Sequence, residues 1–183
     1  IYIVMGKTDP NAPRHSQQSM ILVPADTKGV TVVRPLSVFG YDDAPHGHCE
    51  VIFDNVRVPA ENLLGGEAQL NRGFICLMEQ LPWERLQIAI GAVAAAQSAI
   101  DTTVHYVKER QVFGQAVANY QHTRYTLAEL QTEVQVAQVF VDRCCTLLLD
   151  NKLDTSTASM AKYWCSDLQC KVMDACVQLH GGY

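Results

Sequence analysis

Glu84 is the first candidate for chemistry in this chain. It lies within residues 81–86 (LPWERL), at the expected start of a long helix. An apolar pocket raises the pKa of a carboxyl group and makes it a better general base at neutral pH. The pattern also has a structural explanation, because a proline near the first helical position and an acid in the first turn both favour helix initiation. The spacing alone leaves both interpretations open.

Arg110 is the second candidate, at the head of residues 110–114 (RQVFG). A cation in the last turn and a glycine after it are typical of a helix C-terminus. The alternative is an anion site, in which the guanidinium group pairs with a phosphate. Residues 178–182 (QLHGG) also end a helical pattern with glycine, and alone they predict only a helix end.

Two further segments have a weaker connection to chemistry. Residues 46–49 (HGHC) place three possible metal ligands close together, but no fourth ligand follows at the spacing of a metal site, so we expect no bound metal. Residues 91–96 (GAVAAA) predict a close packing surface between helices, or alternatively room for a long apolar ligand.

The elements that must position these residues fall into two halves with different hydrophobic periods. The first half carries four strand-like runs bounded by turn residues: residues 1–6, 19–24, 30–38 and 49–58. Prolines and turn residues predict loops at residues 9–13 and 42–47. We expect an antiparallel meander whose edges are missing.

Helical periodicity begins at about Gly73. Apolar residues then repeat every three or four positions in three stretches, which predicts three long amphipathic helices in an antiparallel bundle. The expected inward-facing residues are Leu86, Ile90, Val93, Ile100, Val104 and Val107, then Leu127, Leu130, Val134, Ala137, Val141, Cys144 and Leu148, then Ala161, Cys165, Leu168, Val172, Ala175 and Leu179. Either Asp154 or Thr155 is placed to cap the third helix.

The composition excludes several classes of protein. The 183 residues include 14 Lys and Arg against 19 Asp and Glu, a formal charge of −5, and 48% are hydrophobic. A mildly acidic chain with no basic run has no electrostatic footprint for nucleic acid or anionic lipid. No stretch reaches the roughly 18 apolar residues of a membrane span. The seven cysteines lack the spacing of a disulfide framework or a zinc site, which predicts small buried hydrophobes.

Short motifs follow one another in a characteristic order along the chain. They are VIFDNVRVP at 51–59, NLLG at 62–65, RGF at 72–74, ER at 84–85, R-x-x-F-G at 110–114, Gln121, LAE at 127–129, AK at 161–162 and QLHGG at 178–182. With these motifs in this order, the chain resembles the acyl-CoA dehydrogenase family along essentially its whole length.

The resemblance implies an α+β fold, in which the C-terminal part of an antiparallel β-barrel domain precedes an antiparallel four-helix-bundle domain. On this basis residues 1–64 form the second part of the middle β domain, residues 65–82 a linker and short helix, and residues 83–183 a truncated helical bundle. Residues 1 to about 64 look closer to the branch of the family fused to kinase-like domains. We expect an internal piece of a longer protein, because the chain begins inside a strand pattern without an initiator Met or targeting segment.

The resemblance also implies an activity, the FAD-dependent oxidation of a fatty acyl-CoA between its α and β carbons. In the family a carboxylate removes the α proton while the β hydride passes to flavin N5. Most members place this base beyond the end of the present chain, but the long-chain and isovaleryl branches place it in a Glu-Arg-Leu context like residues 84–86. By this similarity Glu84 is the base, Arg85 is a substrate-binding residue, and the acyl chain is of medium or long length. The alternatives are an isovaleryl or branched-chain enzyme and a non-catalytic member that serves as an assembly subunit.

The same similarity implies the cofactor contacts. Arg110 would bind the FAD pyrophosphate across a subunit interface, with Phe113 packing nearby and Gln121 further along the adenosine part. A guanidinium group suits a diphosphate, and glycine lets a backbone approach a ligand closely. The other expected contacts, to the ADP group, come from Gln178, Gly181 and Gly182.

Partners and setting follow from the resemblance as well. It implies a homo-oligomer, with a dimer of dimers expected, and an electron-transfer flavoprotein that accepts the electrons. The expected setting is fatty acid β-oxidation, in the bacterial cytoplasm or the mitochondrial matrix. No nucleic-acid partner and no membrane span is expected.

Overall fold

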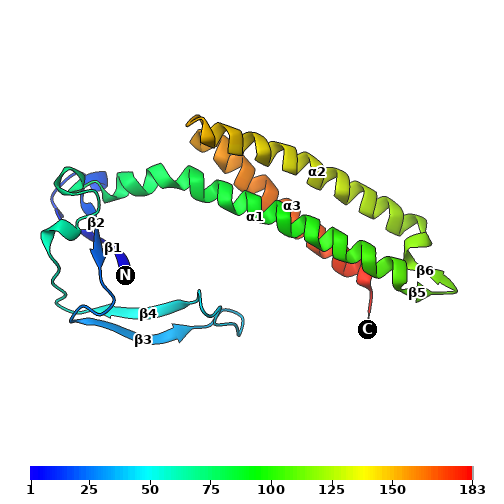
Figure 1. Ribbon diagram of the computed structural model, residues 1–183, viewed down its shortest axis with the longest axis horizontal. Coiled ribbons are helices and arrows are strands. Elements are labelled where there is room, and N and C mark those ends of the chain that lie inside the picture. Colours follow the sequence, from blue (N-terminus) through cyan, green and yellow to red (C-terminus); the bar gives the residue numbers. More distant parts are fainter. Residues whose placement is uncertain (183) are drawn as a thin grey trace. The chain divides into compact units, whose positions relative to one another are not determined.

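A computed structural model describes residues 1–182, and its helices and strands confirm the α+β class (Figure 1). The strands are β1 (Tyr2–Lys7), β2 (Gln18–Val23), β3 (Val30–Leu36), β4 (His48–Phe53), β5 (Gln111–Val112) and β6 (Gln115–Ala116), and the α-helices are α1 (Gly73–Glu109), α2 (Gln121–Leu149) and α3 (Thr155–His180). Short 3₁₀ helices lie in the connections at Arg14–Ser16, Ala60–Asn62, Glu67–Gln69 and Val117–Asn119. Two compact units meet between Met78 and Glu79, so α1 begins in the first unit and continues in the second.

The first unit contains two antiparallel hairpins rather than a meander. β1 pairs with β2, from Tyr2 opposite Val23 to Lys7 opposite Gln18, and β3 pairs with β4. Within residues 1–182 no sheet has more than two strands, so the expected pairing of β2 with β3 is wrong and no closed barrel is present there. The last expected strand is also shorter than predicted, because Asn55 adopts a φ of 49° just after β4 and ends the extended run.

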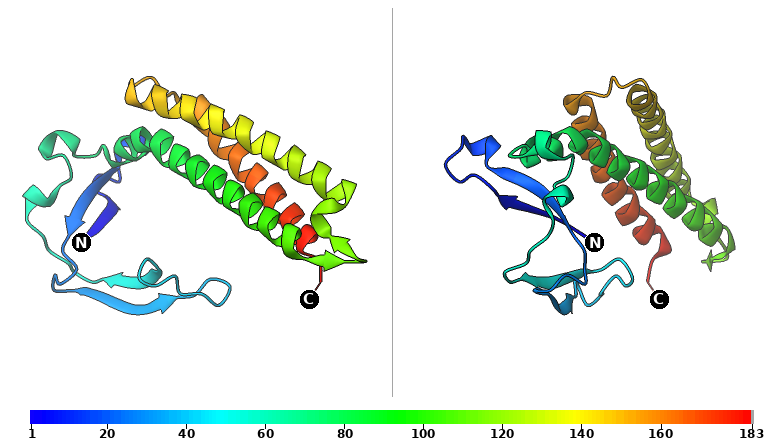
Figure 2. Two further views of the ribbon diagram at one scale, coloured as in Figure 1. Left: turned by 45° about the vertical axis from the view of Figure 1, so that its right-hand side comes forward. Right: turned by 60° about the vertical axis from the view of Figure 1, so that its left-hand side comes forward.

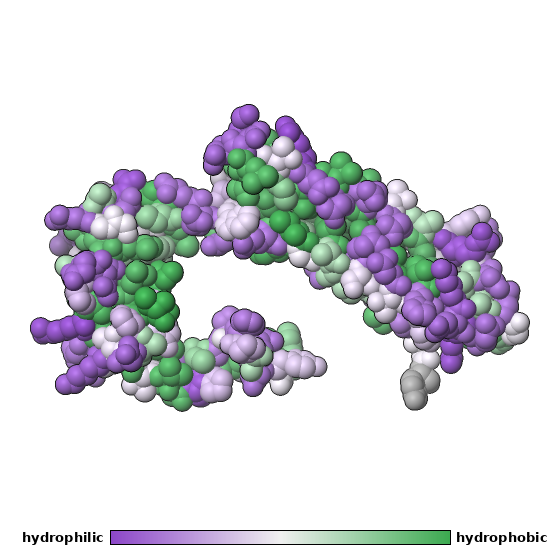
Figure 3. Space-filling model, in the orientation of Figure 1, coloured by the Kyte–Doolittle hydropathy of each residue, from purple (hydrophilic) through white to green (hydrophobic). Residues whose placement is uncertain are grey.

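One face of β1 is apolar and uncovered. The strand alternates between half-buried and exposed residues, and the side chains of Ile3 and Met5 are 63% and 45% exposed. Figure 3 shows the hydrophobic surface that gathers beside this strand. The alternation has the period of two expected for a strand with one face turned to a core.

The start of α1 is fixed on β2 by a buried serine and a glycine. The backbone N–H of Asn71 donates to Ser19 Oγ over 2.8 Å, and Ser19 is fully buried. A Cβ on Gly73 would come within 2.9 Å of the Ser19 carbonyl carbon, so only glycine fits at the first position of the helix. Both contacts lie inside the first unit.

The helix α1 starts at Gly73, where the helical period is expected to begin, but it continues without the break that the sequence predicts between a short helix before residue 83 and a long helix after it. It runs without interruption through Pro82, which lacks an N–H and leaves the carbonyl of Met78 without its helical donor. Glu84 is therefore eleven residues past Gly73 (84 − 73) and not in the first turn, which corrects the expectation. The helix dipole acts within the first turn, so it gives no structural reason for an acid at this position.

The second unit is an antiparallel arrangement of α1, α2 and α3 around one apolar core, as predicted (Figures 1 and 2). The core residues of α1 include Leu86, Ile100 and a set of alanines, and those of α2 and α3 follow the expected stripes. Ile90 is an error of the prediction: it is 39% exposed, and Ala89 occupies the buried position beside it. Among residues 91–96, Ala92, Val93 and Ala96 are buried in the core, which confirms a close packing surface.

The cysteines are all free, and they only partly match their expected role. Cys144, Cys165 and Cys176 are buried in the helical core, whereas Cys49 and Cys170 are exposed. Burial raises the pKa of the Cys165 thiol to about 11, so it stays protonated and behaves as an apolar side chain.

None of the helices formed by residues 1–182 has the length and the continuous hydrophobicity of a transmembrane span. The same residues contain no group of three or more His, Cys, Asp or Glu side chains placed to hold a metal ion.

Asp154 caps α3, which decides between the two predicted caps. Its Oδ1 accepts the N–H of Thr157 over 2.9 Å, and its Oδ2 accepts the Thr157 hydroxyl over 2.6 Å. These hydrogen bonds hold the pKa of Asp154 below its usual 3.8. Because the folded pKa is the lower one, the charged cap contributes stability above pH 3.8, and this contribution is lost as the pH falls through the folded pKa.

We therefore expect Asp154→Asn, which keeps a capping oxygen but does not ionise, to unfold at a lower temperature than the wild type at neutral pH. The two midpoints should converge as the pH falls below 3.8, as measured by thermal unfolding followed by circular dichroism. A gap that stays constant over this range would contradict the ionic contribution.

Candidate functional site

Most of the predicted ligand-binding residues lie at one end of the helical unit. Here α1 ends, α2 begins and α3 ends, with the β5–β6 hairpin beside them (Figure 1). Side-chain contacts tie these segments together: the hydroxyl of Tyr106 donates to the carbonyl of His180, and that of Tyr120 donates to the carbonyl of Val112. The candidate residues at this end are Arg110, Phe113, Gln121, Gln178, Gly181 and Gly182.

The β5–β6 hairpin gives residues 110–114 a structure that differs from the expected helix end. The helix α1 stops at Glu109, and Phe113 and Gly114 form the two-residue turn of the hairpin with φ values of 49° and 84°. Positive φ at both turn positions matches the right-handed twist of a hairpin. Gly114 therefore serves the hairpin turn and does not cap α1, which corrects the expectation.

Phe113 is unusual for both its backbone and its exposure. A positive φ disfavours a bulky side chain, and asparagine or aspartate is the common choice at this position of such a turn. Its ring is 100% exposed on this chain, so it does not pack on Arg110 within the same subunit. Strain of this kind is found at ligand clamps and other functional sites.

The backbone of Arg110 is held on both sides while its side chain is exposed. Its N–H donates to the carbonyl of Tyr106 over 2.9 Å, and its own carbonyl accepts the N–H of Val117 over 2.9 Å. Within residues 1–182 no carboxylate lies within ion-pair distance of its guanidinium group. The arginine is thus presented with its charge available to an anion.

Two glycines follow the C-terminus of α3, at the same end of the bundle as Arg110. Gly181 has a φ of 72°, and its N–H donates to the carbonyl of Gln178 over 3.1 Å, as the predicted glycine cap requires. Gln178, Gly181 and Gly182 are all exposed.

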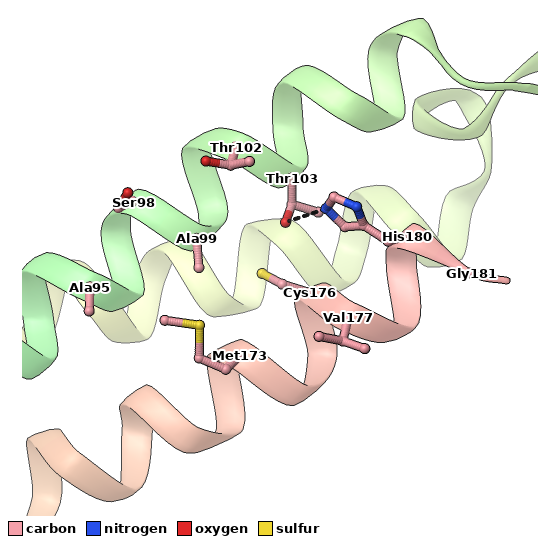
Figure 4. A pocket seen from close by; sticks show the side chains of 10 residues that line it. All are labelled: Ala95, Ser98, Ala99, Thr102, Thr103, Met173, Cys176, Val177, His180 and Gly181. Atoms are coloured by element: carbon pink, nitrogen blue, oxygen red, sulfur yellow. Dashed lines mark hydrogen bonds between the residues drawn. The ribbon is translucent and has the colours of Figure 1, made fainter. Parts of the chain in front are cut away.

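A groove of about 570 Å³ runs between α1 and α3 up to the same end (Figure 4). Small and apolar side chains form most of its walls, and His180 closes the end near Gly181. The lining residues are Ala95, Ser98, Ala99, Thr102, Thr103, Met173, Cys176, Val177, His180 and Gly181.

Glu84 and Arg85 lie far from this end, on the same helix. The side chain of Glu84 is exposed, and Arg85 is half-buried, with a buried Nη1 that has no hydrogen-bond acceptor among the described residues. Buried donors in folded proteins usually have an acceptor, so this nitrogen is available to a group that binds next to it. The 26 residues from Glu84 to Arg110 (110 − 84) correspond to roughly 39 Å along a helix, so one chain does not bring the two candidates together.

The sequence analysis missed the residues that support this end of the bundle. Tyr106 lies one helical turn before Arg110, and Thr103 lies one turn earlier, facing α3. Their helical spacing from Arg110 was available in the sequence. Their partners on α3 were not, because those contacts join residues more than 70 positions apart.

Comparison with known proteins gives this geometry a context. Residues 71–183 match the family described as acyl-CoA dehydrogenase, C-terminal domain. The long-chain specific acyl-CoA dehydrogenase of Mus musculus mitochondria is 42% identical over 183 residues, which cover 100% of this chain and 41% of that protein.

Solved structures agree with the sequence comparison. The crystal structure of an acyl-CoA dehydrogenase from Geobacillus kaustophilus has a TM-score of 0.91 at 40% identity, covering 99% of this chain and 47% of that one. A glutaryl-CoA dehydrogenase from Mycobacterium smegmatis, solved in complex with FADH2, has a TM-score of 0.85 at 26% identity and covers 98% of this chain and 44% of that one.

The chain therefore belongs to the acyl-CoA dehydrogenase family. It spans about two fifths of the length of the mouse relative.

The hairpin turn gives a direct test of backbone strain at Phe113. Phe113→Asn and Phe113→Ala both remove the ring, but only asparagine is well suited to a positive φ. We expect the asparagine variant to be more stable than the alanine variant by about 1 kcal/mol in urea unfolding of the full-length protein. Equal stabilities would show that the left-handed backbone of this residue carries no cost.

Proposed function

We propose that this chain is part of an FAD-dependent acyl-CoA dehydrogenase that introduces a double bond between the α and β carbons of a fatty acyl-CoA. The observation that carries the proposal is a pair of features at two places along one long helix. Within α1, an exposed Glu84 is followed by a half-buried Arg85, and directly after α1 comes an exposed Arg110 that has no acidic partner among the described residues, at the same end of the bundle as the exposed Gly181 and Gly182. The chain belongs to the acyl-CoA dehydrogenase family, and we assign the dehydrogenation reaction of that family to Glu84 and Arg110. A medium or long acyl chain is the proposed substrate, and the 42% identity to the mouse long-chain enzyme supports it.

The residues at the Arg110 end fit an FAD molecule. The Arg110 guanidinium has no acidic partner among the described residues and can pair with a diphosphate. No described atom outside the local chain lies within 4 Å of the position a Cβ would take on Gly181, so the backbone there is open to an approaching group. Phe113 offers an apolar ring, and Gln121 offers an amide at the start of α2. When bound, the flavin would supply the hydride acceptor.

Glu84 would act as the base that removes the α proton of the thioester. Its side chain is exposed on this chain, so a substrate can reach it, and it does not form an ion pair within residues 1–182. Nearby Leu81 and Trp83 would exclude water once an acyl chain is bound. Arg85, whose buried Nη1 has no acceptor among residues 1–182, would bind substrate or hold the base in place.

Two copies of the chain would be needed for one complete site. The pyrophosphate at Arg110 and the flavin ring are joined only by a short ribityl chain, whereas about seven helical turns separate Arg110 from Glu84. The ring of an FAD held by Arg110 would therefore meet the Glu84 of another subunit. This separation supports the proposed homo-oligomer. The proposed electron acceptor, an electron-transfer flavoprotein, follows from the family to which the chain belongs.

The proposal is tested most directly by flavin absorbance. The full-length protein should be yellow, and a long-chain acyl-CoA should bleach the flavin band under anaerobic conditions. A colourless protein, or a flavin that no acyl-CoA reduces, would favour the non-catalytic assembly subunit instead.

Arg110→Ala should weaken FAD binding and the oligomer together. A hydrogen bond to a charged group contributes roughly 1.5–3 kcal/mol, so the FAD dissociation constant should rise about tenfold or more. The measurements are FAD titration of the apoprotein and analytical ultracentrifugation. Arg143→Ala, which removes an exposed arginine near the C-terminal end of α2, is the matched control and should change neither. Full flavin content and an unchanged oligomer in Arg110→Ala would leave Arg110 as a charge at the end of a helix.

Glu84→Gln should abolish most of the activity while leaving folding and FAD binding intact. The amide keeps the shape of the side chain but cannot accept the α proton, so flavin reduction by acyl-CoA should slow by about 10²–10⁴-fold in stopped-flow absorbance. Glu84→Asp should be partly active, because it retains the carboxylate at a shorter reach. Glu79→Gln, an exposed acid on the same helix, should be indistinguishable from the wild type. A near wild-type rate in Glu84→Gln would move the base to another carboxylate of the full-length protein.

A further inference from the structure

Tyr106 makes an unusual set of contacts at the end of α1. Its backbone carbonyl accepts the N–H of Arg110 over 2.9 Å. Its hydroxyl donates to the backbone carbonyl of His180 over 3.1 Å, and its ring stacks on the His180 imidazole with centroids 4.2 Å apart and an interplanar angle of 10°. One residue therefore contacts both the start of the 110–114 segment and the last residue of α3.

The position of His180 is fixed from a second direction. Its Nε2 lies 3.3 Å from Oγ1 of Thr103, which is only 1% exposed (Figure 4). Thr103 and Tyr106 are three residues apart on α1, so they lie on the same side of the helix and face α3 together. The imidazole is held between a buried hydroxyl and an aromatic ring, and Gly181 and Gly182 follow it directly in the chain.

We propose that Tyr106 is a positioning residue, which holds the Gly181–Gly182 turn at a fixed place relative to Arg110 so that both contact the same FAD. This inference rests on the proposed function, because it assumes that these two segments bind the cofactor. The Tyr106 hydroxyl would act through the His180 carbonyl and would not itself touch the flavin.

The physical reason lies in the weakness of helix ends. The last four carbonyls of a helix have no intrahelical partner, and terminal residues fray unless something satisfies them. Glycine adds to this freedom, because it gains the most conformational entropy when released. The Tyr106 hydrogen bond satisfies one of these carbonyls one residue before the two glycines, so it reduces the conformational freedom that would otherwise be lost when FAD binds.

A merely structural role would give a different result from a positioning role. If Tyr106 only stabilised the bundle, removing its hydroxyl would lower the unfolding temperature and leave FAD affinity unchanged. If Tyr106 positions the turn, removing its hydroxyl raises the FAD dissociation constant. The size of this increase then depends on whether Arg110 is present to hold the same cofactor.

The test uses Tyr106→Phe in the full-length protein, which removes the hydroxyl and keeps the ring. We measure the FAD dissociation constant of the apoprotein by flavin fluorescence titration, together with the thermal unfolding midpoint of that apoprotein. The dissociation constant should rise about two- to tenfold, the effect of one neutral hydrogen bond. Tyr125→Phe, which alters a tyrosine that is 67% exposed on α2, is the matched control and should change nothing.

A double-mutant cycle with Arg110→Ala completes the test. The effect of Tyr106→Phe should shrink when Arg110 is absent, because the two segments then no longer share the cofactor. An unchanged dissociation constant in Tyr106→Phe, with a raised one in Arg110→Ala, would overturn the positioning role and leave the proposed function standing. Strictly additive effects would overturn it as well. An unchanged dissociation constant in Arg110→Ala would overturn the cofactor site itself, and the positioning role with it.

Discussion

The continuity of α1 determines how far apart the chemical groups of this chain lie. The helix runs from Gly73 to Glu109 with a proline inside it. It carries Glu84 about three turns after its start and leads into Arg110 at its C-terminal end. A helix fixes the rise per residue, so this separation does not depend on side-chain rotamers or on loop conformation. One copy of α1 therefore does not bring the two groups together, which is why the proposed site draws Glu84 and Arg110 from different subunits.

Small side chains make that packing close. Ala89, Ala92 and Ala96 are almost completely buried along one side of α1, and they face a core that includes Ala137 on α2 and Ala161 on α3. Alanine loses no side-chain entropy in a helix and lets neighbouring helices approach closely, and the leucine, isoleucine and valine side chains of the core fill the space between these contacts. The amide pair of Gln97 and Gln131, with hydrogen bonds of 2.9 and 3.1 Å in the two directions, adds a polar contact between α1 and α2 at the edge of this core.

Local periodicity made the helices predictable, and distant contacts made the rest unpredictable. The stripes of α2 and α3 were recovered almost residue by residue, because a helix repeats a local rule. The continuity of α1 was missed because Pro82 is a typical first-turn residue, which placed the start of the long helix at residue 83 although the helical period already begins at Gly73. The contacts of Gly73 and Asn71 with Ser19 on β2 hold the earlier start in place. The meander was wrong for the same reason, since the pairing of strands across a connection depends on residues that the pattern does not join.

The candidate site was predicted as a set of residues but not as a geometry. Ordered motifs identified Arg110, Gln178 and the glycines, and the structure places them at one end of the bundle. What no motif showed is that this end departs from what stability alone would favour. A phenylalanine takes a positive φ with its ring entirely in solvent, and an arginine without an acidic partner among the described residues stands beside it. Natural sequences are locally consistent except where function requires otherwise, so departures gathered in one place mark this surface as the candidate binding site. The tyrosines behind this surface are, in contrast, hydrogen-bonded. The hydroxyls of Tyr106 and Tyr120 both donate to backbone carbonyls, and these hydrogen bonds restrain the exposed residues before any ligand binds.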